Sequence, residues 1–128
     1  MVRAMYRLVL AAAAALAGCS QTDNNRPATL EYITEAILQP ACSQSVCHSS
    51  LRNERGYAFD TVEAARRSMQ GLVTKGEPAE SSLLYTVLIR PIKRMPYDSP
   101  LPDKDIALIK QWLDDGAPGL FDVAVGAP

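Results

Sequence analysis

The sequence predicts an all-α domain on the strength of three observations. Apolar residues recur at helical spacing in four separate segments, and residues that favour helix ends flank those segments. No stretch longer than a few residues alternates between apolar and polar positions as a strand does. A chain of 128 residues is long enough for one small domain and too short for two.

The first two helices are predicted over residues 29–38 and 61–70. In the first, apolar residues at i, i+3 and i+7 define one buried face, and Pro40 is expected to end the helix. In the second, Asp60 is expected to cap the N-terminus, and Gly71 follows the last helical position.

The other two helices are predicted over residues 79–89 and 103–115. Pro78 stands near the first turn of the third helix, where a proline is tolerated. The fourth helix carries an apolar stripe beside a tryptophan, and Gly116 and Pro118 end it.

The N-terminus has the features of an export signal. Arg3 and Arg7 precede nine apolar residues, a stretch too short to span a bilayer. The next residues, Leu16-Ala17-Gly18-Cys19, resemble a lipobox, which implies removal of residues 1–18 and acylation of Cys19. An ordinary secretory signal with a chance cysteine is the alternative.

The lipid chains would hold the protein on a membrane surface without spanning it. Ser20 is not aspartate, so the resemblance to enterobacterial lipoprotein sorting favours the outer membrane, with the domain facing the periplasm. Residues 19–28 are polar and predict a tether, residues 29–118 the folded domain, and residues 119–128 a surface tail. The formal net charge is −1 and no basic tract is present, so nucleic acid is a poor candidate partner.

With Cys19 acylated, two cysteines remain, Cys42 and Cys47, and His48 is the only histidine. A closed zinc site lacks an obvious fourth ligand, and no nucleophile-elbow pattern accompanies the histidine. Cysteine followed at once by histidine after an earlier cysteine fits the attachment of c-type haem, here with C-x4-C-H in place of the common C-x2-C-H. A Cys42–Cys47 disulfide in an oxidising compartment remains open at this point.

A six-coordinate haem in this chain would need methionine as its second axial ligand, because no other histidine exists. Two methionines remain after the signal peptide is removed. Met69 lies within a predicted helix and is interpreted as a core residue. Met95 lies in a proline-rich loop, and Pro96 restricts it to extended conformations that suit presentation across a pocket. Met95 is therefore the favoured ligand.

The segments ILQPACSQSVCHSS, GEPAESSLLY, RMP and DIALIKQWLDDGAP, in this order, resemble small monohaem cytochrome c domains, in particular the planctomycete type. The resemblance covers about residues 30–118. It implies a cytochrome c-like helical domain around one haem c, with thioether bonds at Cys42 and Cys47 and axial ligation by His48 and Met95. The chain departs from the family in having GYAFD in place of an L-D-L segment and one proline, not two, after the methionine.

With both axial positions filled, the protein is expected to be a carrier of single electrons between redox proteins of the cell envelope, and not an enzyme. Weak peroxidase activity is expected only if the distal ligand is lost. Arg90, Lys93 and Arg94 are candidates for pairing with haem propionates or an acidic partner, or for a solvated charge run. A haem-free, disulfide-stapled lipoprotein module that binds other envelope proteins is the alternative function. Six side chains are expected to wall the haem: Ile37, Leu84, Leu88, Ile106, Ile109 and Trp112.

Overall fold

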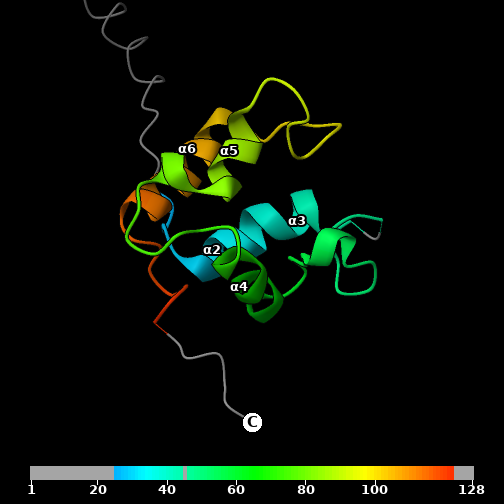
Figure 1. Cartoon of the computed structure of the whole chain (residues 1–128), viewed down its shortest axis with the longest axis horizontal. Coiled ribbons are helices and arrows are strands. Elements are labelled where there is room, and N and C mark those ends of the chain that lie inside the picture. The colour runs from blue at the N-terminus through cyan, green and yellow to red at the C-terminus, as the bar shows by residue number, and fades with distance from the viewer. Residues whose placement is uncertain (1–24, 45, 123–128) are drawn as a thin grey trace, which may run out of the picture.

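The computed structural model describes residues 25–44 and 46–122. Over these residues the chain forms helices and turns and contains no strand, so the all-α prediction is confirmed. The helical run that contains α2 and α3 lies between α4 on one side and the α5–α6 pair on the other (Figure 1). In the described part of the chain, no helix is both long enough and apolar enough to cross a membrane.

The first helical run is longer than predicted. It comprises α2 (Leu30–Ile33), a π-helical turn (Thr34–Leu38) and α3 (Gln39–Cys42). The prediction that Pro40 ends the helix was wrong. Proline lacks an N–H and clashes with the carbonyl four residues earlier in a regular helix. Here the wider turn, closed by the N–H of Gln39 on the Thr34 carbonyl, directly precedes Pro40 and the helix continues to Cys42.

The helix α4 (Val62–Gln70) begins as predicted, but with a different cap. Thr61 is the N-cap, and its hydroxyl accepts a hydrogen bond of 3.1 Å from the backbone N–H three residues on. Asp60 instead accepts hydrogen bonds from the N–H and the hydroxyl of Ser50, at 2.9 and 2.7 Å. Asp60 therefore ties the loop after the cysteine–histidine motif to the start of α4.

The predicted helix over residues 79–89 consists of two pieces, a 3₁₀ turn (Ala79–Ser81) and α5 (Leu83–Ile89). The last helix, α6 (Asp103–Asp114), packs against α5 and ends where the sequence predicts. Gly116 has φ of +89°, and the two residues after the cap donate hydrogen bonds back into the last turn. This is a Schellman ending, which a glycine at that position favours.

Asp114 has a structural role that offsets its place at the negative end of α6. One carboxylate oxygen accepts a hydrogen bond of 2.9 Å from the N–H of Ala79, and the other lies 2.5 Å from the ammonium of Lys110. These contacts, led by Lys110, lower the pKa of Asp114. The side chain thus joins α6 to the 3₁₀ turn before α5.

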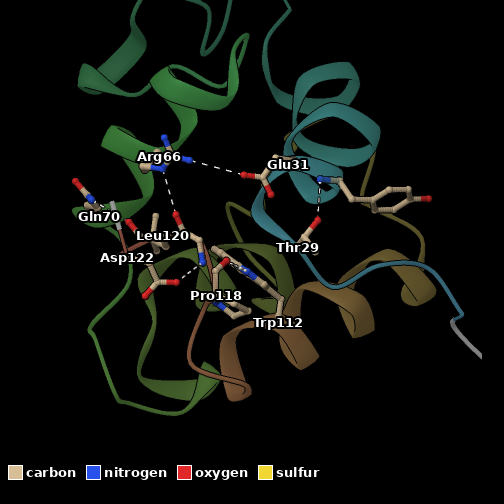
Figure 2. Close-up of polar contacts among 10 residues, drawn as sticks. Thr29, Glu31, Arg66, Gln70, Trp112, Pro118, Leu120 and Asp122 are labelled. Atoms are coloured by element: carbon tan, nitrogen blue, oxygen red, sulfur yellow. Dashed lines mark hydrogen bonds and ion pairs between the residues drawn. The ribbon is translucent and has the colours of Figure 1, made fainter. Parts of the chain in front are cut away.

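The C-terminal segment belongs to the domain as far as Asp122, so the predicted boundary after Pro118 was wrong. Leu120 is fully buried in the core. The carbonyls of residues 119 and 120 accept hydrogen bonds from Arg66 and Gln70 of α4, at 3.2 and 3.0 Å (Figure 2). The indole N–H of Trp112 donates to the Pro118 carbonyl at 3.0 Å. The segment 118–122 thus connects α6 to α4, and residues 123–128 lie outside the described residues.

The end of the predicted tether is also part of the domain. Arg26 donates to the carboxylate of Asp105 at 2.6 Å and to the carbonyl of Lys104 at 2.9 Å. The folded domain therefore begins by Arg26 and not at residue 29. The predicted signal peptide, residues 1–18, and the acylation site Cys19 lie outside the described residues.

The core lies between α2, α4, α5 and α6. Its largest fully buried apolar side chains come from α2, the π-helical turn, α4, α6 and the C-terminal segment: Leu30, Ile33, Leu38, Met69, Leu108, Ile109, Trp112 and Leu120. Two leucines of α5, Leu84 and Leu88, complete it.

Candidate functional site

A cavity of about 470 Å³ opens beside the cysteine–histidine motif. Its walls come from the end of α3 and the loop after it, from Glu54, and from residues 95–99. Four of the lining side chains are the site residues that the sequence singled out: Cys42, Cys47, His48 and Met95. The structure therefore brings Met95 to the motif from a distant part of the chain.

The C-x4-C-H segment folds as a closed turn at the end of α3. The N–H of His48 donates to the carbonyl of Cys42 at 3.0 Å, and the N–H of Cys47 donates to that of Gln44 at 2.8 Å. The first hydrogen bond spans the whole spacer and keeps both cysteines at the cavity, which Gln44 and Val46 of the spacer also line. Ser45, within the spacer, lies outside the described residues.

The ring of His48 is held by one hydrogen bond and two aromatic neighbours. Nδ1 lies 3.0 Å from the carbonyl oxygen of Glu54. Because a carbonyl can only accept, Nδ1 carries the proton, and Nε2 of the neutral ring keeps its lone pair for a metal. The rings of Phe59 and Tyr57 pack against the imidazole, with centroids 5.6 and 6.2 Å away. The N–H of Phe59 also donates to the His48 carbonyl at 2.8 Å.

The two cysteines are free thiols, and both are half-buried. Burial, together with a smaller effect of the nearby Cys47, raises the pKa of Cys42 to about 12. Cys42 is therefore a neutral thiol at neutral pH, and only a small fraction of it is the nucleophilic thiolate.

The backbone of Met95 is held by a hydrogen bond, whereas the residue is partly exposed to solvent. Its N–H donates to the carbonyl of Val87 in α5 at 2.9 Å, and the Met95–Pro96 peptide bond is cis. The side chain remains 38% exposed. Met69, by contrast, is fully buried in the core, as the sequence predicted.

The expected wall of six apolar side chains was wrong for this cavity, because none of the six lines it. Five of them are buried in the core, and Ile106 is half-buried against it. The physical reason is that α5 and α6 turn their apolar faces toward α2 and α4. The apolar lining of the cavity comes instead from loop residues, among them Val46 and Tyr97.

Among the contributors to the site that sequence reasoning missed are the carbonyl of Glu54 and the rings of Tyr57, Phe59 and Tyr97. A backbone carbonyl carries no sequence signal. Phe59 belongs to the GYAFD segment, which has two aromatic residues in a chain with few of them. That local enrichment was the sequence feature that could have indicated a role for Phe59 at the site. Tyr97 follows Met95 closely in a loop otherwise poor in aromatic residues.

Within residues 25–44 and 46–122, no group of three or more His, Cys, Asp or Glu side chains is arranged to hold a metal ion. No protein-family model, curated protein or solved structure matches the chain.

Proposed function

We propose that the chain is a membrane-anchored c-type cytochrome that carries single electrons in the bacterial cell envelope. In this proposal one haem c is bound through Cys42 and Cys47, and His48 and Met95 are its axial ligands. One observation carries it: the two thiols, the only imidazole and the one loop thioether line the same cavity. A Cys42–Cys47 disulfide alone would give no reason for Met95 to line the same cavity as the two cysteines.

The residues present fit a haem in three respects. The donor set is two thiols, an imidazole with a free Nε2 and a thioether, which is the set that a His/Met-ligated haem c uses. The cavity volume is within the range of small-molecule and cofactor sites. Val46 and Tyr97 line it while 74% and 77% exposed, and a large apolar ligand would cover such side chains.

A bound haem supplies a one-electron ferric–ferrous couple, and the chain determines how that couple behaves. His48 presents Nε2 in a fixed orientation because Glu54 holds Nδ1. Met95 would supply the second iron ligand, and because a thioether favours ferrous iron, the midpoint potential would be high. If His48 and Met95 both bind the iron, no ligand position would remain for a substrate, which favours an electron carrier over an enzyme.

The envelope location rests on the sequence. Acylation of Cys19 would anchor the mature chain to a membrane by lipid alone, with the outer membrane favoured, and redox proteins of the envelope would be its partners. Substitution Cys19→Ser is expected to give a soluble protein or an uncleaved precursor without lipid. Release of the unmutated mature protein into the periplasmic fraction without detergent would contradict the anchor.

The absorbance spectrum of the natively exported protein tests the haem proposal. A c-type cytochrome shows a Soret band and resolved visible bands on reduction, and the bands stay with the polypeptide after denaturation. The alternative, a disulfide-stapled binding module, has no visible absorbance. A colourless protein from a host that matures other c-type cytochromes would contradict the proposal.

A further inference from the structure

The segment Arg90–Tyr97 combines positive charge with exposed apolar side chains. Lys93 and Arg94 are exposed, and neither forms an ion pair with a residue in the described ranges. Ile92 is 74% exposed and lies outside the cavity assigned to haem, which Met95, Pro96 and Tyr97 of the same segment line. No acidic residue occurs between Glu80 and Asp98. The guanidinium of Arg90 donates to the Lys93 carbonyl at 2.7 Å and so braces the loop from within.

The chain enters the domain beside the first turn of α6, the helix that follows this loop. Arg26 is held at the first turn of α6 by Asp105, at 2.6 Å. Asp105 and Pro96 line the same groove of about 320 Å³, so this groove connects the site where Arg26 docks with the end of the loop. The loop extends from the ends of α5 and α6, in yellow in Figure 1. Seven residue steps separate Arg26 from Cys19, about 25 Å at full extension.

We propose that the loop Arg90–Tyr97 lies on an anionic phospholipid surface and orients the anchored domain. This inference rests on the acylation of Cys19 in the proposed function. A short tether keeps the domain within reach of the headgroups, and the cations of the loop together with the exposed side chain of Ile92 match an anionic interface. An acidic protein partner would match the charge, but it gives no reason for the tether to dock at a groove that the loop also lines.

Limited trypsin digestion of the native acylated protein in vesicles tests the proposal. Cleavage after Lys93 and Arg94 reports on the loop, and cleavage after the exposed Arg52 and Arg55 of another loop provides a reference in the same molecule. On phosphatidylglycerol vesicles we expect loop cleavage to slow by about fivefold for each cation in contact with the surface, relative to neutral phosphatidylcholine vesicles. The reference sites should be cut equally on both, and high salt should abolish the difference.

A matched pair of variants separates contact from general charge effects. Ile92→Asp is expected to remove the protection, whereas Leu51→Asp, at a residue 90% exposed in the reference loop, is expected to leave it unchanged. Equal cleavage on both vesicle types in a protein that floats with them would overturn this inference alone. A protein that does not float with vesicles would overturn the anchor and this inference with it.

Discussion

The two methionines of the domain allow the same substitution to be made in two contrasting environments. Met69 is fully buried among core side chains, and Met95 lines the cavity with its side chain 38% exposed. Replacement by leucine keeps most of the apolar volume and removes only the sulfur. Met69→Leu and Met95→Leu therefore separate packing from ligation.

The expected effects differ in kind. Met69→Leu should lower the free energy of unfolding by less than about 1.5 kcal/mol and leave the spectrum and the midpoint potential unchanged. Met69→Ala should cost about 2–5 kcal/mol, because the cavity it leaves lies in the core. Met95→Leu should leave the haem covalently bound but replace the thioether by water or by nothing. Each tenfold loss of preference for ferrous iron lowers the potential by about 59 mV.

The assays are absorbance and paramagnetic resonance for spin state, potentiometric titration, and denaturant unfolding. In Met95→Leu we expect loss of the low-spin six-coordinate spectrum, a potential lower by about 60 mV or more, and weak peroxidase activity. A changed spectrum in Met69→Leu together with an unchanged one in Met95→Leu would mean that the wrong sulfur has been assigned.

Two further predictions concern the parts of the fold that hold the site. Leu120→Ala should lower the free energy of unfolding by about 2–5 kcal/mol, because this leucine is fully buried. The control Leu51→Ala, at a residue that is 90% exposed, should change the free energy of unfolding little. Equal effects of the two substitutions in denaturant titrations would contradict the extension of the domain to residue 122. The pKa of Asp60 is lowered because its carboxylate accepts hydrogen bonds from the hydroxyl and the N–H of Ser50. The ionised carboxylate therefore stabilises the folded protein above the unfolded-state pKa, and this contribution is lost as the pH falls through the folded-state pKa. Asp60→Asn should therefore be less stable than the unmutated protein at pH 7, and the two should converge below about pH 4; a constant difference across that range would contradict this role.

Much of the fold could be predicted from the sequence, because helical periodicity and end signals are local. The segment 103–115 is the clearest case: its apolar stripe, Gly116 and Pro118 place α6 (Asp103–Asp114) to within a residue. The prediction that Pro40 ends the first helix failed for an equally local reason. Its usual effect is to end a helix, and only a π-helical turn before it allowed the run to reach Cys42. Such a turn has no simple sequence signature.

The pairings that span the chain could not be predicted in this way. Asp60 was expected to cap α4, yet its partner is Ser50, and nothing in the sequence indicates that Asp114 contacts Ala79 and Lys110. The lack of helical periodicity predicts a surface tail after Pro118, although Leu120 is fully buried in the core. One buried side chain in an irregular segment produces no periodic pattern in the sequence, so its burial could not be predicted.

For the candidate site, too, local sequence features could be predicted and tertiary contacts could not. Residue chemistry and spacing singled out Cys42, Cys47 and His48 as candidates, and the structure brings these three residues to one cavity with Met95 and not with Met69. The lining of the cavity was not foreseen, because loop residues such as Val46 and Tyr97 form it in place of the helical faces. Loops take their positions from tertiary contacts, such as that between the N–H of Met95 and the carbonyl of Val87.

The most direct test of the central claim is the intact mass of the mature protein from a host competent in haem attachment, measured after denaturation, reduction and treatment with a thiol-alkylating reagent. We predict the mass of the acylated polypeptide plus one haem, with neither Cys42 nor Cys47 alkylated. A mass without haem and with both cysteines alkylated after reduction would contradict the cytochrome proposal.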